Sequence, residues 1–272
     1  MPELPEVETV VRYINPYLKG KLIKRISPLN NYKKVFATHT PTTFNNLVMG
    51  QKIKRVWRRA KFIVVDLEAG HILIHLRMTG RLLTKLTEDD KPKHLTVHMQ
   101  LNDGSELYFK DYRKFGRWYY YQNLDYINSR LGIEPLSNGF TADWLYYNLR
   151  NHSRQLKALL LDQSFIAGLG NIYVDEVLWT AKLHPQKLSA TVGRKKNDIL
   201  HSAIQNILQR AIDQQGTTII NFYFGEGSEG NFKNALEIFN RQGQKCHRCG
   251  KIIKKIRVSQ RGTHICPKCQ NK

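Results

Sequence analysis

The sequence predicts an α+β protein in which an N-terminal β-sandwich with flanking helices precedes a helical domain and a zinc-ribbon hairpin. Short segments that alternate apolar and polar residues fill the first part, helical periodicity replaces them, and all four cysteines lie at the end. The predicted boundaries are 1–130 for the sandwich domain, 131–140 for a hinge, 141–240 for the helical domain and 241–272 for the hairpin.

The first domain should open with a helix from residue 5 to about residue 19. Pro5 suits a first turn, and Glu6 and Glu8 suit the positive end of the helix dipole. Four segments then alternate as strands do: 61–67, 71–78, 94–101 and 106–112. Short strands at this spacing favour a sandwich or a barrel.

Helical periodicity dominates after the hinge. The segments are 141–150, 153–163, 171–183 and 195–216, with Thr, Ser, Asn and Asp at the expected caps. Gly168 and Gly170 permit a tight reversal, after which Asn171 can cap the next helix. Exposed amides at such a helix start hold an anion, although an ordinary capped turn is the alternative.

The cysteines have zinc-ribbon spacing. Cys246 and Cys249 form one C-x2-C pair, and Cys266 and Cys269 form another. Two such turns converge on one tetrahedral site, and four thiolates leave no open position, so the zinc should be structural. Two disulfides are the alternative, which a cytosolic location disfavours. We expect one Zn²⁺ per chain, with neither a catalytic metal nor an organic cofactor.

The charge calls for a polyanionic partner. The chain carries 43 Lys and Arg against 22 Asp and Glu, a formal net charge of +21. Basic runs lie at 51–61 and 241–272, which suggests that two separate regions of the chain bind one long ligand. Nucleic acid is the leading candidate for this ligand, and a basic surface that serves only solubility is the alternative. No apolar run approaches the roughly 20 residues of a membrane span. Acids stand where a signal peptide has lysines, so a cytoplasmic location is expected.

Five motifs in order resemble the formamidopyrimidine-DNA glycosylase (Fpg) family of bacteria: "PELPEVE", "HLRMTG", "DYRKFG", "AGLGNIYVDE" and "RGTHICPKC". The resemblance runs from Pro2 to Cys269 and implies a helix-two-turns-helix DNA-binding domain. It also implies a bifunctional base-excision repair enzyme, active as a monomer on double-stranded DNA. Such an enzyme flips out and removes oxidised purines, then cuts the strand by β,δ-elimination.

The resemblance makes Pro2 the nucleophile once Met1 is removed. An α-amino group titrates near pKa 7.7 to 8, so part of it is neutral at physiological pH, and a secondary amine gives an iminium without a further proton. Glu3 would protonate the ring oxygen and Glu6 would orient the amine or a water, whereas Glu8 reads as a solvated helix residue. Charge that complements the helix dipole is the alternative for the acids. Lys61 would assist the first elimination, and Arg261, in the hairpin turn, would assist the second.

The resemblance also implies a duplex-filling wedge and further DNA contacts. The wedge would be Met78, Arg113 and Phe115, which replace the stacking lost when a base leaves the helix. Without the resemblance, Met78 would read as a core methionine. The expected contacts to DNA are His75, His94, Arg113, His152, Lys157 and Asn171, with the histidines only partly charged at neutral pH.

Residues 216–232 align with the loop that covers the flipped base in the family. Its expected members are Thr217, Thr218, Ile220, Phe222 and Tyr223. Ile220 stands where the family pattern has a basic residue, and Phe239-Asn240 replaces Tyr-Gly, which removes a phenol that would bond phosphate. Two alternatives stay open: an oxidised-pyrimidine glycosylase of the endonuclease VIII type, and a non-catalytic zinc protein that binds damaged DNA.

Overall fold

The computed structural model describes residues 1–88, 90–217 and 230–271, and the chain divides into two compact units. The first unit comprises Met1–Ile127 and Gln214–Asn231, and the second comprises Asn128–Asp213 and Phe232–Lys272. The sequence-based division placed residues 214–217 in the helical domain. In the structure the Thr217 N–H donates to Glu6 near the N-terminus, which ties this segment to the first unit.

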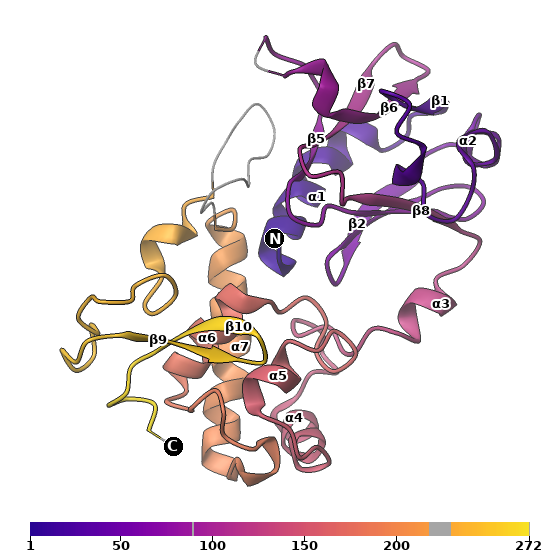
Figure 1. Cartoon of the computed structure of the whole chain (residues 1–272). Coiled ribbons are helices and arrows are strands. Elements are labelled where there is room, and N and C mark those ends of the chain that lie inside the picture. Colours follow the sequence, from indigo (N-terminus) through magenta and orange to yellow (C-terminus); the bar gives the residue numbers. More distant parts are fainter. Residues whose placement is uncertain (89, 218–229, 272) are drawn as a thin grey trace. The chain divides into compact units, whose positions relative to one another are not determined.

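The first unit is a β-sandwich, as predicted (Figure 1). Its first sheet, in the order β1-β6-β7-β5, is antiparallel and contains β1 (Ile23–Pro28), β5 (Gly80–Leu83), β6 (Leu95–Leu101) and β7 (Glu106–Asp111). The second, in the order β2-β3-β4-β8, is also antiparallel and contains β2 (Arg55–Arg59), β3 (Phe62–Asp66), β4 (His71–His75) and β8 (Arg117–Tyr121).

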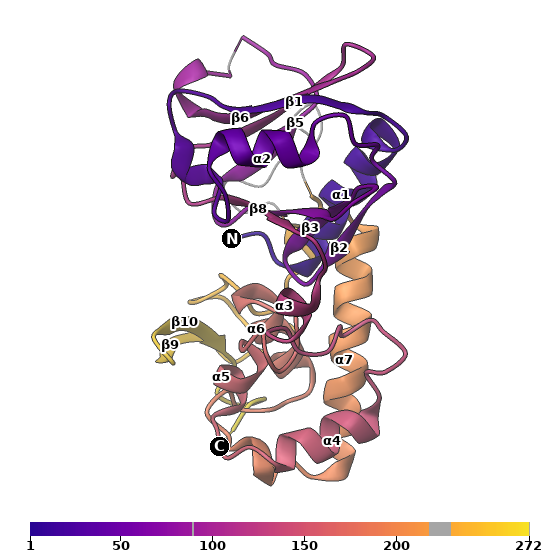
Figure 2. The ribbon, with the colours of Figure 1, turned by 90° about the vertical axis from the view of Figure 1, so that its right-hand side faces the viewer.

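Both sheets contribute to one apolar core. Val97 and Phe109 of the first sheet and Ile63, Ile72 and Trp118 of the second are fully buried in it. Helix α1 (Leu4–Leu18) packs along β2, and α2 (Pro41–Val48) packs along β1 (Figure 2). These flanking helices close the core, because sheets that bury one face need a second layer over it.

The second unit is helical and ends in a hairpin. Its helices are α4 (Ala142–Arg150), α5 (Leu156–Leu160), α6 (Asn171–Thr180) and α7 (Arg194–Asp213), and α3 (Asp125–Asn128) spans the boundary between the units in sequence. Short 3-10 turns lie at Lys33–Val35, Pro92–His94, Ser189–Thr191 and Phe232–Ala235. Strands β9 (Lys254–Val258) and β10 (Arg261–Ile265) pair antiparallel. None of the helices within the described ranges is long and apolar enough to cross a membrane.

Two local predictions in the helical part were wrong. Helix α5 has five residues rather than the eleven of 153–163, because the chain before it pairs with another segment: Gln155 bridges Leu188. Asn171 does not cap α6. Gly170 is the N-cap, and Asn171 is the first helical residue, with its amide directed to the hairpin. The predicted Thr141 cap of α4 is confirmed, since its side chain accepts the Trp144 N–H.

Candidate functional site

The N-terminal turn is held rigidly by buried carboxylates. Glu3 is the N-cap of α1, and its N–H donates to Glu6 Oε2 at 2.8 Å. The other oxygen, Glu6 Oε1, accepts the Thr217 N–H at 2.8 Å. Glu3 and Glu6 are 3% and 2% exposed, whereas Met1 is 52% exposed. Glu6 therefore fixes the turn that carries Pro2 and joins it to Thr217.

Gly216 shows how closely this segment approaches Glu6. Its φ is +80°, a conformation that favours glycine, and a Cβ placed on it would lie 3.0 Å from Glu6 Oε1. Of the expected covering loop, Thr217 is buried here. Thr218, Ile220, Phe222 and Tyr223 lie outside the described residues.

Lys61 lies in the turn before β3, and His75 is the last residue of the neighbouring strand β4 in the second sheet. His75 pairs with Phe62, the residue after Lys61, and both Lys61 and His75 are buried. His75 Nδ1 accepts the Arg77 N–H at 3.0 Å, which places the ring proton on Nε2. Burial, and then the charges of Arg77 and Lys61, lower the pKa of His75 to about 3. The expectation of a partly charged histidine is therefore wrong here: His75 is neutral at physiological pH, with its proton on Nε2.

The three expected wedge residues gather at the end of the sandwich. Met78 is 42% exposed and Phe115 is 47% exposed, which excludes a core position for Met78. The Arg113 guanidinium contacts both: Nη1 lies 2.8 Å from Met78 Sδ, and the guanidinium carbon lies 4.7 Å from the Phe115 ring centre. Two apolar side chains and one cation thus stand together in solvent.

Asp111, which we did not single out from the sequence, fastens the two loops that carry these side chains. Its buried carboxylate accepts the Thr79 hydroxyl, the Arg113 N–H at 3.2 Å and the Gly116 N–H at 2.7 Å. Thr79 in turn accepts the Arg113 N–H at 3.0 Å. The sequence feature that could have indicated Asp111 is the presence of an acid inside the basic motif "DYRKFG".

In the second unit, Lys157 has a different environment from the expected phosphate contact. It is fully buried, and its ammonium donates to Asp175 Oδ1 at 2.6 Å and to the Gly262 carbonyl at 3.5 Å. The Asn171 amide also donates to the Gly262 carbonyl, at 3.0 Å. Both side chains therefore converge on the residue after Arg261. The structure corrects Lys157 from a DNA contact to a residue that holds the hairpin.

Helix α6 binds the hairpin and the segment that leads into it through two consecutive acids. Asp175 Oδ2 accepts the His264 N–H at 2.9 Å, and the Glu176 carboxylate accepts the N–H groups of residues 237–239 at 2.8 to 3.0 Å. Burial raises the pKa of Glu176, against the lowering effect of these three donors. Arg261 itself is exposed and is the first residue of β10, after a turn formed by Ser259 and Gln260 at positive φ. The sequence feature that could have indicated the roles of Asp175 and Glu176 is the pair of adjacent acids in the motif "YVDE".

His152 and His94 occupy different environments. The His152 ring bonds through Nδ1 to the Asn148 carbonyl at 2.8 Å and packs edge-on against Phe165, so it serves the fold of the second unit. His94 is half-buried, and its ring lies 4.4 Å from that of Tyr112.

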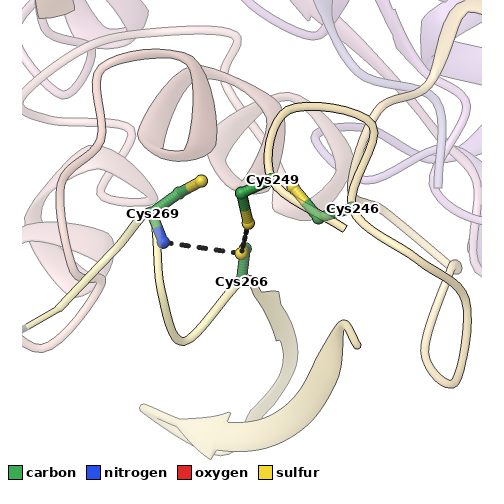
Figure 3. Close-up of side chains that lie close together, drawn as sticks. All are labelled: Cys246, Cys249, Cys266 and Cys269. Atoms are coloured by element: carbon green, nitrogen blue, oxygen red, sulfur yellow. Dashed lines mark hydrogen bonds between the residues drawn. The ribbon is translucent and has the colours of Figure 1, made fainter. Parts of the chain in front are cut away.

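The four cysteines form the metal site that their spacing predicts (Figure 3). Their sulfurs all lie within 4.8 Å of one another, and Cys249 Sγ lies 3.4 Å from Cys266 Sγ. A tetrahedral zinc with bonds of about 2.3 Å needs sulfurs about 3.8 Å apart, which this arrangement brackets. Trp179, Ile238 and Ile253 pack around the site. The residues fit one structural Zn²⁺.

A sandwich with an exposed wedge and a basic zinc hairpin held on a helical unit define a zinc-containing protein that binds DNA. Three family descriptions match the chain: "Formamidopyrimidine-DNA glycosylase N-terminal domain" over residues 1–118, "Formamidopyrimidine-DNA glycosylase H2TH domain" over residues 131–222, and "Zinc finger found in FPG and IleRS" over residues 243–272. The chain belongs to the formamidopyrimidine-DNA glycosylase family.

Individual relatives agree along the full length. Formamidopyrimidine-DNA glycosylase of Protochlamydia amoebophila is 42% identical, with all of both chains covered, and that of Herpetosiphon aurantiacus is 41% identical over 99% of this chain and all of its own. Among solved structures, MutM in complex with DNA containing carbocyclic 8-oxo-G has a TM-score of 0.89 at 37% identity, with all of both chains covered. Lactococcus lactis Fpg with abasic-site DNA has a TM-score of 0.89 at 35% identity, covering 99% of this chain and all of that one.

Proposed function

We propose that this chain is a bifunctional base-excision repair enzyme that removes oxidised purines, 8-oxoguanine and formamidopyrimidines, from double-stranded DNA and then cleaves the strand at the abasic site. The observation that carries the proposal is the N-terminal turn. A chain with a net charge of +21 buries two carboxylates, Glu3 and Glu6, directly after Pro2. Burying a carboxylate costs free energy that hydrogen bonds only partly offset, and buried titratable groups of this kind cluster at functional sites.

The chemistry follows from a secondary amine. Removal of Met1 leaves the Pro2 nitrogen, which attacks the anomeric carbon while the glycosidic bond breaks and the base leaves with a proton. The nitrogen lone pair then opens the sugar, whose ring oxygen takes a proton from Glu3, and an iminium results. Loss of a C2′ proton expels the 3′ phosphate, a second elimination expels the 5′ phosphate, and water releases Pro2.

The other expected residues support this reaction. Lys61 assists the first elimination, and Arg261 assists the second. Met78, Arg113 and Phe115 fill the space left by the extruded base, with Arg113 on the orphaned partner base. Glu6 positions the turn rather than taking a proton, because both of its oxygens accept backbone N–H groups. We propose that the enzyme works as a monomer in the bacterial cytoplasm, on nucleoid DNA.

Borohydride trapping tests the proposal. The untagged protein is incubated with a duplex that carries one 8-oxoguanine opposite cytosine, beside the variants Pro2→Gly and Glu3→Gln. We expect a covalent protein–DNA band in the wild type, mapped to Pro2 by mass spectrometry, and none in Pro2→Gly. A band on oxidised pyrimidines instead would support the endonuclease VIII alternative. Tight binding without a band on any duplex, or an N-terminus that retains Met1, would contradict the enzymatic function.

A further inference from the structure

The loop that carries Arg113 and Phe115 contains a residue in an unfavourable backbone conformation, Lys114. Its φ is +57°, in the left-handed region that residues with a side chain seldom adopt. Such a residue persists only where its surroundings hold it. Phe115, which follows directly, is the 47% exposed aromatic ring of the wedge. The direction of that ring therefore depends on the contacts that fix Lys114.

Two side chains hold the main chain next to Phe115. The Tyr32 hydroxyl donates to the Lys114 carbonyl at 2.5 Å. Arg117 Nη1 donates to that same carbonyl at 3.0 Å and to the Gly116 carbonyl at 2.7 Å. It also lies 3.2 Å from the Tyr32 hydroxyl oxygen, so the two side chains contact each other. The main chain is therefore held both immediately before and immediately after Phe115.

A tight turn positions Tyr32 for this contact. Asn30 and Asn31 both have positive φ, of 51° and 53°, and the Tyr32 N–H donates to the Leu29 carbonyl at 3.0 Å. Positive φ at both central residues is characteristic of a type I′ turn, which asparagine tolerates well. Tyr32 is the last residue of this turn, so the local sequence fixes the point from which its side chain extends.

Arg117 lies beside Tyr32 because the chain that follows the turn pairs with β8. The Ala37 N–H donates to the Trp118 carbonyl at 2.8 Å, and Arg117 is the first residue of that strand. Hydrogen bonds from a charged guanidinium are stronger than those from a neutral donor. Arg117 thus provides a charged donor to the main chain of the loop that carries the wedge.

We propose that Tyr32 and Arg117 are positioning residues that hold Phe115 ready for insertion into the base stack. The proposal rests on the proposed function and deepens it, because insertion accompanies the departure of the damaged base from the duplex. Asp111 holds two N–H groups of the loop, while Tyr32 and Arg117 hold two of its carbonyls. A loop that is ordered in advance loses less conformational entropy on binding than one that must be ordered then. Insertion should therefore be faster with both side chains present.

The rate of insertion can be measured without any cleavage. The probe is a duplex with an uncleavable abasic analogue and, beside it, 2-aminopurine, a fluorescent base that stacking quenches. Mixing with saturating protein should raise the fluorescence as the wedge unstacks this base. We expect the increase to be about fivefold slower in Tyr32→Phe, which loses one ordinary hydrogen bond, and about tenfold slower or more in Arg117→Leu. Arg117→Lys, which can still donate to a carbonyl, should lie between Arg117→Leu and the wild type.

Tyr120→Phe is the matched control. It removes a hydroxyl that donates to a main-chain carbonyl, that of Ala69 at 3.2 Å, near the opposite end of β8 from Arg117. This control should keep the wild-type rate. Equal rates in Tyr32→Phe and Tyr120→Phe would overturn the proposal, whether or not the wild type cleaves DNA. Borohydride trapping at Pro2 on a single-stranded abasic oligonucleotide, where no base pair has to open, tests the proposed function separately. Both phenylalanine variants should be trapped at the same rate.

Discussion

At the scale of single residues, His75 shows how a hydrogen bond and burial decide a charge. In the folded chain its pKa is about 3, whereas an unfolded histidine has about 6.5. The unfolded state therefore binds more protons below pH 6.5, and the stabilising contribution, full above pH 6.5, is lost as the pH falls toward 3. At pH 5 the loss should be about 2 kcal/mol.

The variant His75→Asn tests this, because its amide oxygen can accept the Arg77 N–H without titrating. We expect the free energy of unfolding in urea to fall by about 2 kcal/mol less between pH 7.5 and pH 5 in the variant than in the wild type. Subtracting the two proteins removes the contributions of all other groups. An identical decrease in both would show that His75 is protonated in the folded chain.

Phe239 is a second residue whose chemistry can be tested alone. Its ring packs edge-on against His264, with ring centres 4.9 Å apart, at a position where the resemblance predicts a tyrosine. Phe239→Tyr adds a hydroxyl without changing the ring. A restored phosphate hydrogen bond is worth about 1 kcal/mol, so affinity for an abasic-analogue duplex should rise about fivefold. Unchanged affinity would mean that this ring edge does not face phosphate.

At the scale of elements, α6 couples the hairpin to the helical unit. Lys157 and Asp175 form a fully buried ion pair, and breaking such a pair by removing one partner costs about 3 to 5 kcal/mol. The double variant Lys157→Met/Asp175→Asn removes both charges, while the amide oxygen at 175 can still accept the His264 N–H. The Gly262 carbonyl then keeps only the Asn171 bond, so Arg261 should lose its fixed position.

The measurement is the ratio of δ- to β-elimination products on an abasic duplex. We expect this ratio to fall about tenfold or more, since small displacements of a positioned group have large effects on rate. Zinc content and borohydride trapping at Pro2 should stay at the wild-type level, which separates lost positioning from lost folding. The single variant Lys157→Arg keeps the positive charge at this position, so its ratio of δ- to β-elimination products should lie between those of the double variant and the wild type. A wild-type ratio in the double variant would mean that α6 does not position Arg261.

The elements differ in how well their sequences predict them. The four strands β3, β4, β6 and β7 were predicted because alternating apolar residues mark them. The strands β1, β2, β5 and β8 were not predicted. The strand β2 was missed because it lies in a basic run, and β5 was missed because it has only four residues. Helix α5 was predicted too long, since a distant segment pairs with the chain before it. Local patterns carry no information about such a partner.

At the scale of the whole chain, the sequence predicts the site where neighbouring residues define it. The four cysteines could be assigned from spacing alone. The hydrogen bonds between Glu6 and Thr217 and between Lys157 and Gly262 join residues that are 211 and 105 positions apart in the sequence. The residues next to each partner give no indication of these bonds. Family resemblance supplied residue names, but only the structure separates Lys157, which holds the hairpin, from side chains open to DNA.

Removal of zinc should unfold the hairpin at the end of the second unit and leave the sandwich of the first unit folded. The hairpin has a small apolar cluster in which Cys246 and Cys266 are themselves members, so without metal it retains little that could keep it folded. The sandwich has its own large core, to which no cysteine contributes among the described residues. A chelator should therefore remove backbone protection from β9 and β10 in hydrogen exchange, while β6 and β7 keep theirs. DNA affinity should fall with it, because the hairpin carries Arg261. Loss of protection throughout the sandwich, or a protected hairpin at zero zinc, would contradict this division of stability.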